Sequence, residues 1–465
     1  MNQNAAEIIS DAARQGVKLW VEDGKLRFRT EHGKLPDELR AAIKANRSQI
    51  MDELEHGGSS SFQAHPEDAH QPFPLTDVQS AYLLGRRDSV SGGGVSCHAY
   101  FEIGARELEV ADIQRAYETV VADHDALRTR FDEAGFQQVL PVSQVEVPRI
   151  VEAHSDDESA LLDLREQMSH MVHDASVPPL MGIGYSTHGS VRTVHVSIDF
   201  LVADWTGIMR ILDDLFEVAH GRSLSQEPAR ITFRDYVLAL QAEDDSEARE
   251  YWQGRLGDIA LGVDVPMCSG EWERRFTRLE CTLDETEWDC FRKVAQSMEV
   301  SPSALLLALY AQVISFWSAQ ERNAITVTLF NRRPYHEDVP KLVGDFTSTG
   351  FAVLGSSEST LRELAHQAAG ELMAIVEHSA YSGVKVIRDV VKQLDGETPS
   401  YPFVFTSAVA DDRSSEFEHS WSIDYGITQT PQVGIDFQAA TIGGALHVNW
   451  DVRAGVLAPG VPEAM

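Results

Sequence analysis

The chain has 465 residues, of which 43% are hydrophobic, and this length allows two to four domains with sizeable cores. The formal net charge of −33 argues against nucleic acid as a partner. The longest apolar run, from Ala304 to Trp317, is too short to span a bilayer, and no signal peptide opens the chain, so we expect a cytoplasmic protein without a membrane anchor.

Residues 1–56 predict a small α+β unit. Apolar residues from Ala5 to Ala12 have helical spacing, and residues 17–30 alternate around Asp23-Gly24 as in a hairpin. Residues 35–55 predict one or two further helices. A two-stranded hairpin needs helices to cover one face, and it keeps a free edge to which a partner can add a strand. Residues 57–72, rich in Gly, Ser, Pro and His, read as a linker.

Residues 73–255 predict the first of two α/β lobes. A helix begins after Thr76 as its N-cap, and a strand follows at residues 98–103. Residues 109–131 predict an amphipathic helix, and residues 191–200 alternate as a strand. Two more helical stretches follow. The first ends at Gly221, and the second, over residues 233–257, is broken near Asp244.

Residues 256–465 predict the second lobe. Asp284 caps one helix, Ser301-Pro302 starts the next, and Ser359 caps a third. Several short strands, among them residues 402–408, 432–438 and 445–451, alternate with these helices. Two α/β lobes of similar size predict a cleft between them.

The cysteines and histidines predict neither a disulfide framework nor a metal site. The four cysteines contain no C-x-x-C pair, so we expect reduced thiols. They are Cys97, Cys268, Cys281 and Cys290. His170 and His173 have a spacing that metal ligands can adopt, but no third ligand motif accompanies them. Glycine motifs for phosphate binding are also absent, so we expect no metal and no cofactor in this chain.

Seven ordered motifs, six of them besides a D-x-x-x-x-D pattern, carry a resemblance to a known family. "PFPLTDVQSAYLLGR" resembles the opening motif of nonribosomal peptide synthetase condensation-type domains, and "HDALRTRF" resembles their H-x-x-L-R-x-x-F motif. Where amide-forming members have "HHxxxDG", this chain has "DFLVAD", from Asp199 to Asp204. That D-x-x-x-x-D pattern is typical of the heterocyclisation subfamily. "LVGDFTST", "YPFVFTS", "ITQTPQVGIDFQ" and "GGALHVNWD" resemble its later motifs. Gly207 departs from a Ser in the usual signature.

The resemblance covers residues 72–465 and implies a fold. It implies two chloramphenicol-acetyltransferase-like lobes in a V-shaped pseudo-dimer. The unit at residues 1–56, with "GVKLWVEDGKLRFR", resembles the tubulysin-type docking domain, which captures the C-terminal tail of an upstream subunit. Since adenylation and carrier domains normally follow in this family, we expect a piece of a longer synthetase.

The resemblance also implies a two-step reaction. An acyl thioester on the phosphopantetheine of an upstream carrier protein is attacked by the amine of Cys, Ser or Thr on a downstream carrier. The side chain of that residue then closes a thiazoline or oxazoline ring with loss of water. The family's catalytic pair falls on Thr406 and Asp436. Candidate lining residues of the same site are Gln429, Thr430, Gln432 and Ser407.

We expect Asp199 and Asp204 to brace the structure rather than to shuttle protons. Asp204 precedes a helix and could cap it. Two neighbouring carboxylates raise each other's pKa unless a cation lies between them. The candidate cations are Arg128, Arg332 and Arg333. Two alternatives to heterocyclisation stay open, namely a plain amide-forming condensation domain and an inactive scaffold that binds carrier proteins.

Overall fold

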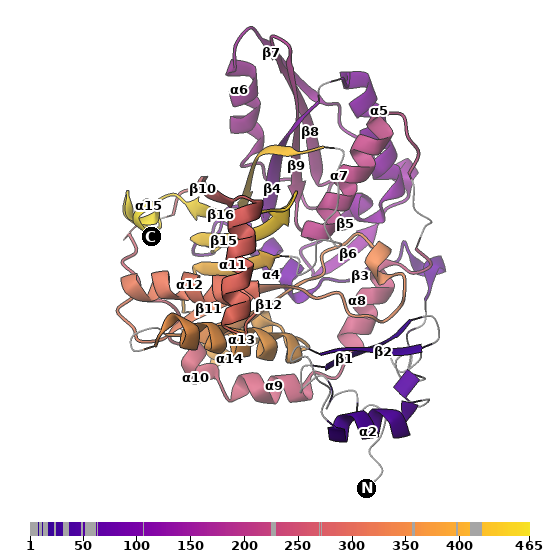
Figure 1. Cartoon of the computed structure of the whole chain (residues 1–465). Helices are drawn as coiled ribbons and strands as arrows, with labels where there is room; N and C mark the ends of the chain where they lie inside the picture. The colour runs from indigo at the N-terminus through magenta and orange to yellow at the C-terminus, as the bar shows by residue number, and fades with distance from the viewer. Residues whose placement is uncertain are drawn as a thin grey trace. The chain divides into compact units, whose positions relative to one another are not determined.

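The computed structural model describes residues 8, 12, 17–22, 25–30, 37–47, 50–51, 62, 64–105, 107–224, 229–268, 270, 272–355, 359–396, 399–409 and 421–465. The chain divides into two compact units. The first comprises residues 1–67, 228–240 and 332–342, and the second comprises the rest. Figure 1 follows the chain from the N- to the C-terminus.

The first unit contains the predicted hairpin. Strand β1 (Val17–Glu22) pairs antiparallel with β2 (Lys25–Thr30), and α2 (Asp37–Ala45) follows. Its apolar cluster draws on both segments predicted to be helical, and its buried members are Ile8, Ala12, Leu39, Ile43 and Ile50. The rest of the predicted helix before the hairpin, the turn at residues 23–24 and most of the linker lie outside the described residues.

The later segments of the first unit meet at a buried carboxylate. Arg230 Nε donates to Asp338 Oδ2 at 2.7 Å, and Lys341 Nζ lies 2.9 Å from Asp338 Oδ1. Hydrogen bonds from Arg230 and Lys341 hold the pKa of Asp338 well below its usual value. The 3-10 turn Val339–Lys341 belongs to this unit, and Arg332 Nη1 donates to the Leu342 carbonyl at 2.9 Å.

The second unit contains two large sheets with separate apolar cores. The first sheet has five strands in the order β14 (Ile423–Gln429), β4 (His98–Gly104), β9 (Val191–Asp199), β8 (Met181–His188) and β7 (Val151–Ser155). Helices α5 (Val110–Asp123) and α7 (Trp205–Ala219) pack side by side, and α6 (Ser159–Met168) contacts β7, β8 and β9 (Figure 1).

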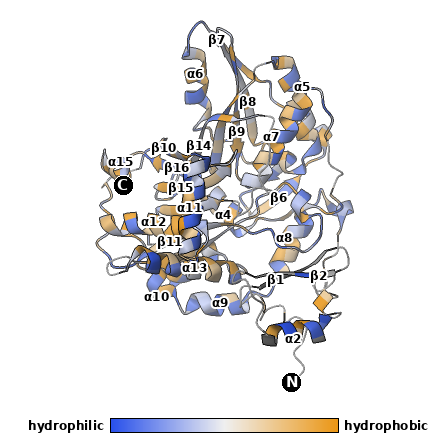
Figure 2. Ribbon diagram, viewed as in Figure 1, coloured by the Kyte–Doolittle hydropathy of each residue, from blue (hydrophilic) through white to orange (hydrophobic). Residues whose placement is uncertain are grey.

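The second sheet has six strands and is mixed, because β13 is parallel to both β11 and β15. The order is β10 (Phe276–Leu283), β16 (Ala445–Arg453), β15 (Ile435–Ile442), β13 (Phe403–Ala408), β11 (Asn323–Phe330) and β12 (Thr347–Leu354). Four longer helices belong to the same half: α11 (Glu285–Ser297), α12 (Pro302–Trp317), α13 (Leu361–Glu377) and α14 (Gly383–Gln393). In Figure 2, apolar residues gather on α12, whose buried face supplies much of the core.

Short elements complete the second unit. They are α4 (Asp77–Gly85), the three-stranded sheet β3 (Phe73–Pro74), β6 (Phe136–Val139) and β5 (Thr129–Phe131), and the helices α8 (Phe233–Ala242, which starts in the first unit), α9 (Ser246–Gln253), α10 (Leu256–Ile259) and α15 (Val461–Ala464). There are also 3-10 turns at Pro66–Asp68, Asp125–Arg128 and Val142–Gln144. Within the described part of the chain, no single helix is long and apolar enough to cross a membrane; α11 and α12 pass that test only as a pair bent by 90°.

Most predicted helix boundaries are confirmed. Thr76 and Gln79 form a capping box at α4, while Asp284 and Ser301 cap α11 and α12. The break near Asp244 separates α8 from α9. The cap of α13 is Thr360, so the prediction of Ser359 is wrong by one residue.

Strand β14 is the main departure from the expected layout. Its sequence position places it in the predicted second lobe, residues 256–465, yet it pairs with β4 at the edge of the first sheet. The chain therefore returns from the second half of the unit to complete the sheet of the first half. From Thr193 to Asp199 both faces of β9 are buried, including the polar one.

Candidate functional site

Thr406 and Asp436 lie on neighbouring parallel strands, β13 and β15. The register sets Thr406 opposite Gln438 and Val404 opposite Asp436, so these four side chains share one face of the six-stranded sheet. Thr406 Oγ1 lies 3.3 Å from Asp436 Oδ1 and 3.1 Å from Thr328 Oγ1 on β11. The two residues that the family motif singles out are therefore in hydrogen-bonding contact.

Asp436 has neutral hydrogen-bond donors on both carboxyl oxygens. Gln438 Nε2 donates to Asp436 Oδ2 at 2.8 Å, and Thr406 reaches Oδ1. The residue keeps some accessible surface, although protein atoms crowd around its carboxyl group. Burial raises the pKa of Asp436 to about 7, and the hydrogen bonds from Gln438 and Thr406 oppose that rise. A carboxyl group of this kind can give and accept a proton near neutral pH.

The Thr406 hydroxyl can follow the protonation state of Asp436. When Asp436 is ionised, Thr406 donates to Asp436 Oδ1 and can accept from the hydroxyl of Thr328. When Asp436 carries a proton, it can donate to Thr406, which then donates to Thr328. A hydroxyl group can rotate between these arrangements without moving heavy atoms, because it is both donor and acceptor. The pair is thus held in place in both protonation states.

The other predicted lining residues lie away from this contact. Ser407 is wrong as a lining residue, because strand neighbours alternate between faces and its Oγ contacts Ser303 Oγ at 2.8 Å at the start of α12. Gln429 Nε2 donates to Ser96 Oγ at 3.3 Å. Gln432 is exposed, and its backbone N–H donates to the carbonyl of Gly92 at 2.7 Å.

Thr430 contacts a buried cysteine. Thr430 Oγ1 lies 3.5 Å from Cys97 Sγ. Burial raises the pKa of the Cys97 thiol, which also shares a hydrogen bond with Tyr82 of α4. Burial likewise raises the pKa of Tyr82. Thr430, Cys97 and Tyr82 are therefore neutral polar neighbours.

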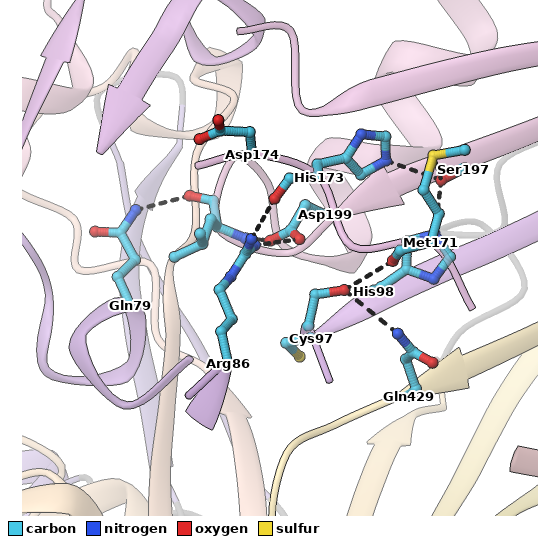
Figure 3. Close-up of polar contacts among 12 residues, drawn as sticks. Gln79, Arg86, Cys97, His98, Met171, His173, Asp174, Ser197, Asp199 and Gln429 are labelled. Atoms are coloured by element: carbon cyan, nitrogen blue, oxygen red, sulfur yellow. Dashed lines mark hydrogen bonds and ion pairs between the residues drawn. The ribbon is translucent and has the colours of Figure 1, made fainter. Parts of the chain in front are cut away.

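Asp199 is fully buried and forms an ion pair at the end of β9. Its counter-ion is Arg86 at the end of α4, whose Nη2 donates to Asp199 Oδ2 and whose Nη1 donates to the His173 carbonyl at 2.6 Å (Figure 3). The Leu201 N–H donates to Asp199 Oδ1 at 2.9 Å. Burial raises the pKa of Asp199, and Arg86 and the Leu201 amide oppose that rise.

Asp204 caps α7, as its position suggested. Its Oδ1 accepts from the Gly207 N–H at 2.8 Å, and its own N–H donates to the Gly344 carbonyl at 2.9 Å. Gly207 suits this start of the helix, since a Cβ there would lie 3.1 Å from Asp204 Oδ1. A larger side chain at this position would need its neighbours to shift, which gives a local reason for the departure from Ser.

Arg128 is wrong as a counter-ion of Asp199. Its Nη2 pairs with Asp125, and its Nη1 donates to the carbonyl of Val121 at 2.9 Å. Arg86 was not predicted as the counter-ion of Asp199, although the opening motif ends on it. Nothing in the order of residues along the chain places α4 beside the end of β9. Gln438 was not predicted either, although the two-residue period of a strand places it on the face of Asp436.

The histidines with metal-ligand spacing have other contacts. His170 Nε2 accepts from the Phe276 N–H at 2.9 Å, and His173 Nε2 lies 2.9 Å from Ser197 Oγ. Burial lowers the pKa of His173 to about 4. Among the described residues, no group of three or more His, Cys, Asp or Glu side chains could hold a metal ion.

Two family models match this chain. The model described as "Condensation domain" matches residues 71–451, and the model described as "TubC N-terminal docking domain" matches residues 6–55. Pyochelin synthetase PchF from Pseudomonas aeruginosa is 29% identical over 99% of this chain and 26% of its own length. Phenyloxazoline synthase MbtB from Mycolicibacterium paratuberculosis is 32% identical over 86% of this chain and 35% of its own length.

A solved structure covers nearly the whole chain. The EpoB cyclization-docking bidomain of a nonribosomal peptide synthetase from Sorangium cellulosum has a TM-score of 0.83 and 28% identity, covering 99% of this chain and 95% of that chain. The first condensation domain of the calcium-dependent antibiotic synthetase, at 14% identity and a TM-score of 0.65, shares the fold. The chain thus spans about a quarter of PchF and about a third of MbtB.

Proposed function

We propose that this chain, which belongs to the condensation domain family and begins with a match to the TubC-type docking domain, is a heterocyclisation domain of a nonribosomal peptide synthetase. It would join a carrier-bound acyl group to carrier-bound Cys, Ser or Thr in the cytoplasm and then cyclise the amide. The observation that carries the proposal is the contact between Thr406 and Asp436, with the pKa of Asp436 raised to about 7.

The first step is amide formation. The acceptor amine attacks the donor thioester, the C–N bond forms, and the carrier thiol leaves with a proton. A thioester has a good leaving group, so this step depends mainly on holding the two substrates in position. We assign the substrates to the phosphopantetheine arms of two partner carrier proteins and no cofactor to the chain itself.

The second step is cyclodehydration, and it requires a group that handles protons. The thiol or hydroxyl of the acceptor residue adds to the amide carbonyl while Asp436 takes its proton. The same carboxyl group returns this proton to the oxyanion, which becomes a hydroxyl group. As the C–O bond breaks and the C=N bond forms, the nitrogen gives up its proton to Asp436, which passes it to the departing hydroxyl so that this group leaves as water. Thr406 orients Asp436 in both states, and the pKa near 7 suits both halves of the exchange.

Two alternatives make different predictions. A plain condensation domain would form the linear amide and stop. It is disfavoured by Asp199 and Phe200, which stand where amide-forming members have histidines, and by similarity to the EpoB cyclization-docking bidomain. An inactive scaffold is disfavoured by the intact contact between Thr406 and Asp436.

One reconstitution separates the three functions. The chain is mixed with an acyl-loaded donor carrier and a cysteine-loaded acceptor carrier, and the product is weighed by mass spectrometry. Heterocyclisation gives a product lighter than the amide by one water. The linear amide alone would support plain condensation, and unchanged substrates would support the scaffold.

We further propose that residues 6–55 bind the C-terminal tail of an upstream synthetase subunit. The two-stranded sheet of β1 and β2 fits this role, because an added strand can pair with a hairpin edge. The test compares pull-down of the upstream subunit by the full chain and by a chain lacking residues 1–56. Loss of capture with retained ring formation on supplied carriers supports the proposal, and equal capture by both chains contradicts it.

A further inference from the structure

A polar chain runs outward from Asp436 across the six-stranded sheet. Gln438 Nε2 donates to Asp436 Oδ2 at 2.8 Å and to Thr428 Oγ1 at 2.6 Å. Thr428 in turn donates from both its hydroxyl, at 2.7 Å, and its backbone N–H, at 2.8 Å, to Asp451 Oδ2. These contacts link Asp436 to Asp451 through one amide and one hydroxyl.

A buried ion pair anchors the far end of this chain. Arg278 Nε lies 2.7 Å from Asp451 Oδ1, and Arg278 Nη2 lies 2.6 Å from Asp451 Oδ2. Side-chain exposure is 11% for Arg278 and 1% for Asp451. This two-pronged geometry fixes the orientation of the Asp451 carboxylate, and Thr428 adds two further donors on Oδ2.

The surroundings allow the Gln438 amide only one orientation. Its nitrogen faces the acceptors Asp436 and Thr428, and its oxygen faces the donor Arg278 Nη2 at 3.4 Å. Flipping the amide would set its oxygen against a carboxylate and its NH₂ group against a guanidinium. Gln438 therefore presents a donor, and not an acceptor, to Asp436.

The chain joins the two halves of the second unit. Thr428 belongs to β14, the edge strand of the five-stranded sheet, whereas Asp436, Gln438 and Asp451 belong to the six-stranded sheet. Gly426, two residues before Thr428, allows close packing, because a Cβ there would lie 3.4 Å from Arg278 Nη1 and 3.1 Å from Phe101. The return of β14 thus brings in a hydroxyl group that accepts from Gln438 and donates to Asp451.

We propose that Gln438 is a positioning residue for Asp436, held by Thr428 and the Arg278–Asp451 pair, so that ring closure depends on contact between the two sheets. The inference rests on the proposed function, because it concerns the proton-transfer step assigned to Asp436. Gln438 does not touch the reacting atoms in this scheme. It fixes the orientation of the carboxyl group and favours its ionised form over its protonated form.

The charges around Asp436 fit this role. Gln438 and Thr406 lower the pKa of Asp436 through hydrogen bonds, Asp451 raises it, and Arg278 lowers it. Tyr82 on α4 and Tyr310 on α12 are also within electrostatic reach of Asp436, and burial raises the pKa of both phenols, so both stay neutral near pH 7. Gln438 is thus the donor nearest to Asp436 Oδ2 among the groups that favour its ionised form.

The test measures ring formation against pH with loaded carrier proteins. In the unaltered chain, ring closure should rise with pH with a midpoint near 7, because Asp436 must be ionised to accept the thiol proton. Gln438→Met keeps the side-chain volume but removes the donor, so the midpoint should move up by about one pH unit. Gln438→Glu adds a third carboxyl group and should move it further.

Thr428→Val tests the connection to the first sheet. It leaves Gln438 in place but removes the nearer of two acceptors of its second N–H, since Asp451 Oδ2 remains at 3.4 Å. The midpoint should therefore move in the same direction by a smaller amount. Gln296→Met on α11 and Thr282→Val on β10 change exposed residues. They are the matched controls and should keep the original midpoint. If Gln438 and Thr428 only supported the fold, their substitution would lower the yield of ring product or the amount of folded protein at every pH, and the pH midpoint of ring formation would not move.

The outcomes separate the inference from the proposed function. Ring formation by Asp436→Asn at the normal rate overturns the proposed function, whatever Gln438 does. If Asp436→Asn forms only linear amide while Gln438→Met and Gln438→Glu keep the original midpoint, the positioning role of Gln438 is wrong and the proposed function stands. Should Gln438→Met fail to fold, the midpoints of Gln438→Glu and Thr428→Val decide the question alone.

Discussion

Asp199 on β9 and Asp436 on β15 are two sheet aspartates whose surroundings differ. Asp199 is fully buried and has a guanidinium, that of Arg86, directly on its carboxylate. Asp436 keeps accessible surface and has only a hydroxyl and an amide on its oxygens, from Thr406 and Gln438. Both have a raised pKa, and that of Asp436 reaches about 7.

This difference shows that direct partners and access decide what an aspartate can do. A carboxylate bound to a cation and sealed from solvent is a poor proton shuttle, because any proton transfer breaks its ion pair. A carboxyl group with neutral donors and an open side can change protonation state at little structural cost. We therefore assign bracing to Asp199 and proton transfer to Asp436.

The largest expected effect is that of Asp436→Asn. Asparagine keeps the shape and the contact with Thr406 but cannot accept the thiol proton. Ring formation should fall by about 10²–10⁴-fold while linear amide accumulates, as read by mass spectrometry. Asp424→Asn, an exposed aspartate on β14, is the control and should cyclise normally. Equal loss of both products would mean that Asp436 supports folding or binding instead.

The next effect is on stability at Asp199. Arg86→Met leaves the buried Asp199 carboxylate without its cation, so the free energy of unfolding should fall by about 3–5 kcal/mol in urea titration. Arg87→Met is a matched control one residue away, because Arg87 is half-exposed and pairs with exposed Glu133 at 3.7 Å. That change should cost less than about 1 kcal/mol. Similar losses of unfolding free energy in Arg86→Met and Arg87→Met would contradict the bracing role of Asp199.

The sequence predicted most of the local structure, because caps, turns and alternation are local signals. Thr76, Asp284 and Ser301 begin their helices as expected, and the alternating segment ending at Asp199 is a strand. The cap at Ser359 was misplaced because Thr360 follows it, and both residue types accept the same hydrogen bond.

Long-range pairings could not be predicted in the same way. The partner of Asp199 is 113 positions earlier in the chain, and charge alone left several arginines as candidates. The return of β14 to the first sheet has no local signature, so the link from Thr428 to Asp451 was also missed. The family motif placed Thr406 beside Asp436, but the residues that set the charge of the site came only from the fold.

A smaller effect, on stability against pH, sharpens the contrast. The folded state raises the pKa of Asp436 from 3.8 to about 7, so it binds more protons than the unfolded state between those values. Asp436 therefore costs stability increasingly as pH rises through this window. Asp436→Asn removes that cost, and its stability relative to the unaltered chain should grow by about 2–3 kcal/mol between pH 5 and pH 8. A pH-independent difference would contradict the raised pKa.

The smallest effect is expected at Thr406. Thr406→Val keeps the shape but removes the hydroxyl that orients Asp436, so ring formation should fall about tenfold, equivalent to about 1.4 kcal/mol. Thr441→Val on β15 is the control, since the Thr441 hydroxyl is buried without a hydrogen-bond partner within the described residues. Because Asp436 and Gln438 remain, some cyclisation should persist in Thr406→Val. A loss as deep as that of Asp436→Asn would instead make the hydroxyl an obligatory member of the proton path, and the contrast with Asp199 would then rest on the pair rather than on one carboxyl group.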